Sequence, residues 1–220
     1  MRRPNFFIVG AAKSGTTSML RYLSQHPDIS MPQKREPNHF GRDLASHSNR
    51  ITNRSEYLSI FADCGGEPVI GEKSVWYLYS QVAAEEIKEF NPDSRIMIVL
   101  RNPLDMIYSL HHQFLTTGNE TVTSFDEAIA LIDERNAGRG IPESAYFPEG
   151  LIYTRVPRYS EQVSRYLRAF GRERVHIIRF EELASETDRV YADAVRFLDV
   201  SDQQVPNFAI YNKKMKPRSR

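Results

Sequence analysis

The sequence predicts an α/β fold, in which a central parallel sheet lies between layers of helices. Three short apolar runs, at residues 6–9, 95–100 and 175–180, have the length of buried strands. Amphipathic stretches with helical spacing separate these runs, and such alternation is typical of a parallel sheet wrapped by helices. A turn rich in small residues follows the first run, at the edge where sheets of this kind bind ligands.

The first strand is predicted at residues 6–9, where an apolar run closes at Gly10. The helix that follows covers residues 16–25. It ends before Pro27, because the residue preceding a proline avoids the helical region. The next elements are predicted in this order: a loop at 30–54, a short helix at 56–62, a strand at 69–73, a helix at 80–90 and the clearest buried strand at 95–100.

The second half of the chain is predicted to continue the alternation. Pro103 suits the first turn of a helix. Ser124 and Glu127 have the spacing of a capping box, which opens a helix that extends to about residue 135. The remaining elements are a glycine- and proline-rich loop at 136–150, a helix at 152–170 that is interrupted or started near residue 157, a strand at 175–180 and a last helix at 192–198.

Length and composition limit the function classes. The 220 residues favour one domain spanning 1–220, and whether its C-terminal end is complete stays open. Lys plus Arg number 29 and Asp plus Glu 28, which argues against a nucleic-acid partner. No apolar run reaches the roughly 18 residues of a membrane span. The single cysteine, Cys64, cannot form an intrachain disulfide, which favours a cytoplasmic protein.

Residues 10–18 have the composition of an anion cradle. The turn lies between a strand and a helix, so backbone N–H groups and the positive end of the helix dipole point at one place. Lys13 precedes Gly15 by two residues, whereas a standard P-loop places its lysine after the second glycine. A helix start rich in capping residues is the alternative. The cradle residues are Lys13, Ser14, Gly15, Thr16, Thr17 and Ser18.

A second anion-binding element is predicted where the strand at 95–100 ends. Arg101 follows that strand, and Ser109 lies about two helical turns further on. A basic residue stands where a nucleoside-triphosphate enzyme would hold magnesium with an acid, so an anion bound without a metal fits better. The alternative is that Arg101 pairs with a local carboxylate such as Asp105.

These motifs resemble those of sulfotransferases that use 3′-phosphoadenosine 5′-phosphosulfate (PAPS). Residues 13–18 resemble the loop that binds the 5′-phosphosulfate, and residues 101–109 resemble the motif that binds the 3′-phosphate. The bacterial and heparan-sulfate-type branch is the most similar. Three further stretches match that branch in order: KREPNHF at 34–40, GEKSVWY at 71–77, and residues 180–183 ahead of 197–198.

The resemblance implies a P-loop-like three-layer fold and a single sulfotransferase domain. It also implies an enzyme that moves a sulfuryl group from PAPS to a hydroxyl or amine of a small molecule or glycan, with no metal. It assigns Glu36 as the base, Lys13 as the cation at the leaving oxygen and Lys73 as a second cation. Residues 13–18, Arg101 and Ser109 would bind the nucleotide.

Several alternatives stay open at this level. Glu36 could instead be a surface acid paired with Lys34 or Arg35, and Lys73 a solvated lysine beside Glu72. The family closes its nucleotide site with a late basic loop containing glycine, but residues 210–220 are basic and have no glycine. A P-loop kinase for a small metabolite and a non-catalytic anion-binding interaction module are the competing functions. The sequence does not identify the acceptor or the oligomeric state.

Overall fold

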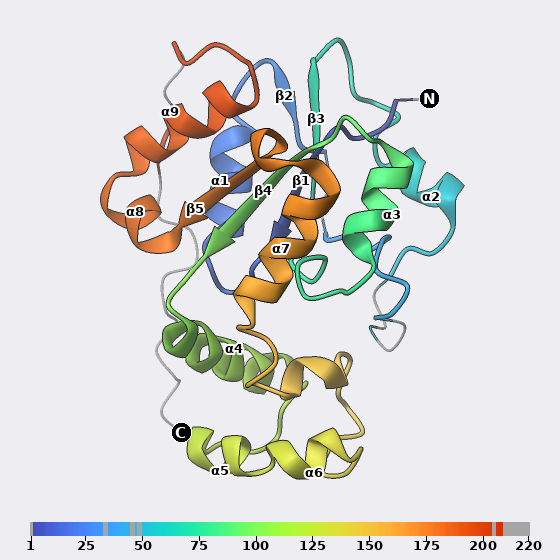
Figure 1. Cartoon of the computed structure of the whole chain (residues 1–220), viewed down its shortest axis with the longest axis vertical. Helices are drawn as coiled ribbons and strands as arrows, with labels where there is room; N and C mark the ends of the chain where they lie inside the picture. Colours follow the sequence, from blue (N-terminus) through green and yellow to red (C-terminus); the bar gives the residue numbers. More distant parts are fainter. Residues whose placement is uncertain (1, 33–34, 45–46, 48–49, 204–205, 209–220) are drawn as a thin grey trace.

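A computed structural model describes all residues except 1, 33–34, 45–46, 48–49, 204–205 and 209–220. Its centre is a five-stranded, all-parallel sheet with the strand order β2-β3-β1-β4-β5, as the sequence predicts for the class (Figure 1). The first strand in the chain is therefore the central one. The strands are β1 (Phe6–Gly10), β2 (Ile29–Ser30), β3 (Val69–Lys73), β4 (Arg95–Leu100) and β5 (Val175–Arg179).

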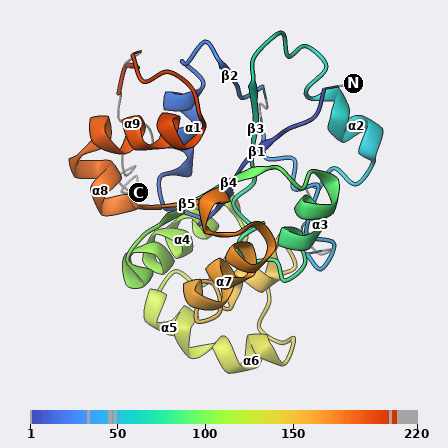
Figure 2. The ribbon, with the colours of Figure 1, turned by 45° about the horizontal axis from the view of Figure 1, so that its top comes forward.

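Helices cover both faces of the sheet and its carboxyl end. One core cluster joins a face of the sheet to α2, α3 and α7, and a second joins the other face to α1, α8 and α9 (Figure 2). A third unit, α4 to α6, lies beyond the ends of the strands. The helices are α1 (Thr16–Leu23), α2 (Arg54–Ser59), α3 (Ala83–Phe90), α4 (Pro103–Thr117), α5 (Phe125–Ala130), α6 (Ile132–Asn136), α7 (Tyr159–Phe170), α8 (Phe180–Ser185) and α9 (Thr187–Phe197).

The sequence prediction differs from the structure at four elements. β2 has two residues, too few for a periodic pattern, and it exists because it pairs with β3. α8 buries only Leu183, so it carries no apolar repeat. The helix expected over 124–135 breaks at Leu131 into α5 and α6. The last helix begins at Thr187 rather than at 192.

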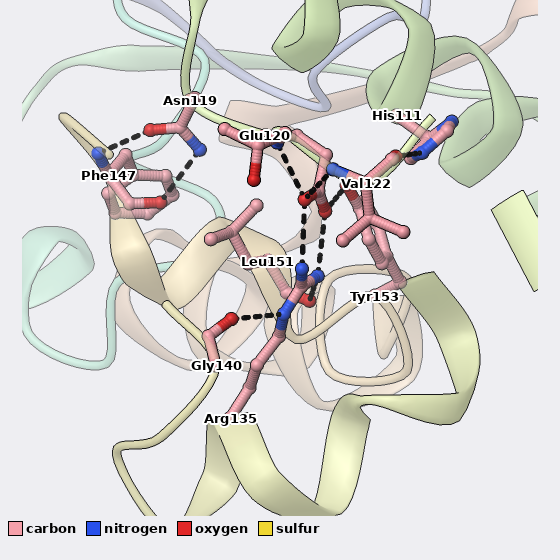
Figure 3. A network of polar contacts seen from close by, with 10 residues as sticks. His111, Asn119, Glu120, Val122, Arg135, Gly140, Phe147, Leu151 and Tyr153 are labelled. Carbon is pink, nitrogen blue, oxygen red and sulfur yellow. Dashed lines mark hydrogen bonds and ion pairs between the residues drawn. The ribbon is translucent and has the colours of Figure 1, made fainter. Parts of the chain in front are cut away.

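A buried ion pair holds the α4–α6 unit together (Figure 3). The side chains of Arg135 and Glu120 are both 0% exposed, and the two guanidinium–carboxylate hydrogen bonds measure 2.7 and 2.9 Å. Tyr153 donates its hydroxyl to the same carboxylate at 3.1 Å. Burial acts to raise the pKa of Glu120, but the bonds from Arg135 and from backbone N–H groups outweigh it and the pKa is lowered. The pair therefore ties α6 to the segment between α4 and α5 and, through Tyr153, to the residues that precede α7.

Candidate functional site

The turn after β1 passes through two positions that only glycine fits. A Cβ on Gly10 would lie 2.6 Å from the Cβ of Leu78 and 2.9 Å from the carbonyl oxygen of Val75. Gly15 has φ 87°, and a Cβ there would lie 3.0 Å from the ring of Phe180. The chain can thus pass from the central strand into α1 while packed against both neighbouring segments.

The N-terminus of α1 is free of the groups that usually neutralise a helix start. Its N-cap is Gly15, no side chain among the described residues caps it, and its first turn contains no acidic residue. Ser14 is buried, and its hydroxyl donates to the carbonyl of Ala12 at 3.2 Å. The positive end of the helix dipole therefore faces the turn without a carboxylate beside it.

Two cations lie side by side at this helix start. Arg101 donates to the backbone oxygen of Lys13 at 3.3 Å, and its guanidinium carbon lies 4.7 Å from the centroid of the Phe180 ring. Burial lowers the pKa of Lys13, and the positive charge of Arg101 lowers it further. Neither cation forms an ion pair with a carboxylate among the residues that the structure describes. This arrangement suits a bound anion, which would offset both charges.

The alternative pairing of Arg101 with Asp105 is wrong in the described structure. Asn102 caps α4 instead, and its side-chain oxygen accepts from the N–H groups of Leu104 and Asp105 at 3.0 and 3.4 Å. The carboxylate of Glu181 accepts from the backbone N–H of Asn102 at 3.0 Å. Arg101 is therefore held by the Phe180 ring and the backbone oxygen of Lys13 rather than by an ion pair with Asp105, and the Glu181 carboxylate is near enough to interact with its charge.

Two residues of this region were not predicted from the sequence. Phe180 follows β5, the neighbour of β4, so its ring reaches Arg101 through sheet pairing. Tyr159 begins α7, and its buried hydroxyl faces Ser14 and the Arg101 backbone without a well-formed hydrogen bond in the described part of the chain. Burial raises the pKa of Tyr159 to about 12. Phe180 lies in the stretch 180–183 that resembles the family, but that resemblance gave it no role in the site, and no motif marks Tyr159.

The other residues that the sequence predicts to bind the nucleotide lie on the two helices that start at this edge. Thr16 is buried and Thr17 and Ser18 are half-buried in the first turn of α1. Ser109 is half-buried on α4, two turns beyond Arg101. The described contacts place these side chains on the correct elements but do not join Ser109 to residues 13–18.

Glu36 and Lys73 form an ion pair next to the turn. Lys73 ends β3, and its register partner in β1 is Ile8, two residues before the turn begins. The carboxylate of Glu36 binds the Lys73 ammonium group and accepts from the backbone N–H of Val75 at 3.1 Å. The interpretation of Lys73 as a solvated lysine is therefore wrong, because its side chain is 10% exposed, and Glu36 pairs with Lys73 rather than with Arg35. Lys34 lies outside the described residues.

The histidines near the site have local contacts. A ring nitrogen of His39 lies 2.7 Å from the carbonyl oxygen of Ile51, and burial lowers the pKa of this histidine. His111 is buried and lies 2.9 Å from the carbonyl oxygen of Val122. His112 is exposed on α4. The basic tail at 210–220 lies outside the described residues.

The fold and this site together define a class: a three-layer parallel α/β protein that presents cations and a helix N-terminus to an anion at the end of its central strand. A family model for the sulfotransferase domain matches residues 3–220, so the chain belongs to the sulfotransferase family, which is a family of enzymes. Among the described residues, no helix combines the length and apolarity needed to cross a membrane.

Individual relatives agree with this placement. A crystal structure of a sulfotransferase from Alicyclobacillus acidocaldarius is 36% identical, with a TM-score of 0.85 over 97% of this chain and 88% of that one. The bifunctional heparan sulfate N-deacetylase/N-sulfotransferase 1 of Caenorhabditis briggsae is 24% identical over 90% of this chain, which spans 23% of that protein. The mouse sulfotransferase SULT7A1, complexed with PAP, shares the fold at 16% identity and a TM-score of 0.55, over 91% of this chain and 60% of that one.

Proposed function

We propose that this chain transfers a sulfuryl group from PAPS to a hydroxyl or amine of an acceptor. The observation that carries the proposal is the pair of cations, Lys13 and Arg101, which lie beside the uncapped start of α1 with no carboxylate paired to either in the described residues. Two like charges held together in a partly buried place are stabilised by an anion. The family to which the chain belongs uses PAPS, and a relative of the same fold is complexed with PAP.

The nucleotide would lie along the carboxyl edge of β1 and β4. In this proposal residues 13–18 bind the 5′-phosphosulfate through backbone N–H groups, hydroxyls and Lys13. Arg101 and Ser109 bind the 3′-phosphate. When bound, PAPS supplies an activated sulfuryl group, and the protein needs no metal to neutralise it because the cations are its own.

The transfer would be an in-line displacement between the acceptor and the leaving phosphate. Glu36 takes the proton of the attacking group, a new bond forms to sulfur, and the bond from sulfur to the bridging phosphate oxygen breaks. Lys13 offsets the negative charge that grows on that oxygen. The ion pair with Lys73 and the bond from Val75 hold the Glu36 carboxylate in one place beside the turn.

Membership of the family supports only a broad class of acceptor. The similar Caenorhabditis briggsae protein is named for N-sulfation of heparan sulfate, which supports an amine or hydroxyl of a glycan as the first acceptor to try. A small hydroxyl compound is the second. We also propose that the protein is cytoplasmic, as its single cysteine favours.

A thermal-shift comparison tests the nucleotide assignment. The chain is heated with adenosine 3′,5′-bisphosphate (PAP), with ATP plus magnesium, and in buffer alone. Binding to the folded state raises the midpoint, so a shift with PAP and none with ATP plus magnesium supports the proposal. A shift with ATP plus magnesium alone favours a small-metabolite kinase. PAP stabilisation without label transfer from radiolabelled PAPS to any glycan or hydroxyl compound favours a non-catalytic binding module.

A further inference from the structure

Glu72 is a fully buried carboxyl group that the proposed reaction does not use. It is 0% exposed and directly precedes Lys73 in β3. Because successive side chains of a strand point to opposite faces, Lys73 reaches Glu36 while Glu72 points into the core beneath α2. A buried carboxyl is costly unless it is hydrogen-bonded, so its partners indicate its role.

The partners of Glu72 lead to the segment that carries Glu36. Its two carboxylate oxygens accept from the hydroxyls of Tyr57 at 2.6 Å and Ser74 at 2.8 Å. The Ser74 oxygen in turn accepts from the backbone N–H of Asn38 at 3.0 Å. Glu72 is thus connected through one serine to the backbone two residues beyond Glu36.

The same network reaches this segment at two more points. The Tyr77 hydroxyl accepts from the backbone N–H groups of His39 at 2.8 Å and Phe40 at 3.3 Å. The His39 ring stacks on the Tyr57 ring, with centroids 4.1 Å apart and planes 5° from parallel. The end of β3 and the residues after it therefore hold residues 36–40 at several points: Lys73 and Val75 bind the Glu36 carboxylate, and Ser74 and Tyr77 bind the backbone at 38–40.

We propose that Glu72 is a positioning residue for sulfuryl transfer. Through Ser74 it fixes the backbone at Asn38 and through Tyr57 the ring of His39, and so keeps the Glu36 carboxylate beside the turn that binds the phosphosulfate. The inference rests on the proposed function, because it gives Glu72 its role through the base Glu36. A displacement of a catalytic group by about 1 Å can lower the rate ~100-fold, so a fixed loop backbone has a direct kinetic consequence.

The charge of Glu72 decides how well this network can form. An ionised carboxylate accepts from both hydroxyls, whereas a protonated one donates its own proton, so that one of the two hydroxyls must accept instead of donate. Burial raises the pKa of Glu72 to about 7, against the opposing hydrogen bonds from hydroxyls. Protonation of Glu72 therefore changes the hydrogen bonds that hold residues 36–40 as the pH falls through neutrality; because the folded pKa is raised, protonation does not lower the stability of the folded state. The titratable groups that act on Glu72 are Tyr57 from α2, Tyr77 after β3, Tyr166 from α7 and Glu36 from the loop.

Two variants test the inference in the full chain. Glu72→Gln keeps the shape but replaces one accepting oxygen by a donor, and Ser74→Ala cuts the connection to Asn38. PAP affinity is measured by calorimetry, and kcat, KM for PAPS and the pH–rate profile are measured well below the unfolding midpoint, with a chitosan oligosaccharide that offers amines and hydroxyls. We expect both variants to bind PAP within a few fold of the parent and to lose roughly 10- to 100-fold in kcat. The acid limb near pH 7 should be absent in Glu72→Gln.

A matched pair of tyrosine variants separates positioning from general loss of packing. Tyr57→Phe removes a hydroxyl bound to Glu72, whereas Tyr191→Phe removes a buried hydroxyl that has no partner in the described structure. Only Tyr57→Phe should lower kcat. The inference is overturned by a kcat of Glu72→Gln and Ser74→Ala close to that of the parent, by an acid limb near pH 7 that persists in Glu72→Gln, or by loss of PAP affinity in both variants. If Glu72→Gln does not fold, the kcat values of Ser74→Ala and Tyr57→Phe test the inference in its place. A parent that binds PAP but transfers nothing overturns the proposed function and the inference with it.

Discussion

Replacing Arg135 by Met should lower the free energy of unfolding more than any single change at the surface does. The variant keeps most of the side-chain volume but leaves the Glu120 carboxylate buried without its counter-charge (Figure 3). It also removes the donors to the carbonyl oxygens of Gly140 and Leu151. Removing one partner of a buried pair typically costs about 3–5 kcal/mol, because the remaining charge is no longer compensated.

The network around Glu120 sets the size of this effect. After the change the carboxylate still accepts from the N–H groups of Thr121 at 2.9 Å and Val122 at 3.0 Å and from the Tyr153 hydroxyl at 3.1 Å. Those three bonds place the loss near the lower end of the range, about 3 kcal/mol. For a domain of this size that corresponds to a fall in Tm of roughly 6–12 °C.

The loss should also depend on pH in a defined direction. In the parent the pKa of Glu120 is lowered, so the stability that this carboxylate contributes is present at neutral pH and is lost as the pH falls through the folded pKa. Without Arg135, burial acts against the charge and the pKa of Glu120 rises. The variant can then relieve the penalty by binding a proton, so the difference in unfolding free energy between parent and variant should shrink from pH 8 to pH 5.

Urea unfolding at several pH values measures both effects. Arg196→Met is the control, because Arg196 pairs with Asp193 at 3.1 Å on the surface, with side chains 60% and 35% exposed. Exposed pairs contribute about 0–1 kcal/mol, so the control should match the parent at every pH. An Arg135→Met variant that is as stable as the control, or whose deficit grows on acidification, would refute the reasoning.

Three further predictions concern the catalytic region. Lys13→Ala should lose ~10²–10³ in turnover, because it removes the cation at the leaving oxygen; a turnover within a few fold of the parent contradicts the role. Arg101→Ala should weaken PAP roughly 10- to 150-fold, the effect of a lost charge-assisted bond, and adenosine 5′-phosphosulfate much less. Calorimetry with both ligands checks this, and equal weakening shows that Arg101 binds something other than the 3′-phosphate. Glu36→Gln should leave PAP affinity within a few fold while the single-turnover rate with saturating PAPS falls roughly 10²–10⁴-fold; transfer close to the parent rate removes Glu36 as the base.

Some of the site was predictable because its residues are neighbours in the chain. Residues 10–18 are close together in the chain. The end of a strand, a turn with two glycines that allow close backbone packing, and the start of a helix follow one another, and the structure has these elements where the sequence predicts them. The strand at 69–73 and the strand at 95–100 were predicted with the bounds that the structure has. Buried strands of a parallel sheet are apolar throughout, so they can be recognised without their partners.

Other parts depended on pairing across the sheet. Arg101 and Phe180 are 79 positions apart in the chain, and they meet because β4 and β5 are neighbours and both end at the same edge. Glu36 lies in the loop that follows β2, and it meets Lys73 because β2 pairs in parallel with β3, which ends at Lys73. The sequence predicts that these residues can carry charge chemistry, but the strand order determines which of them share a place.

The sequence by itself determined the fold class, the strand–turn–helix at residues 6–23 for which we propose anion binding, and the family resemblance, because each depends on residue order over short distances. The tertiary structure decided that Lys73 is a buried partner of Glu36 rather than a solvated side chain, and that Glu72 lies in the core on the opposite face of the same strand. Adjacent residues of a strand point in opposite directions, and only the elements packed on each face show what each side chain meets.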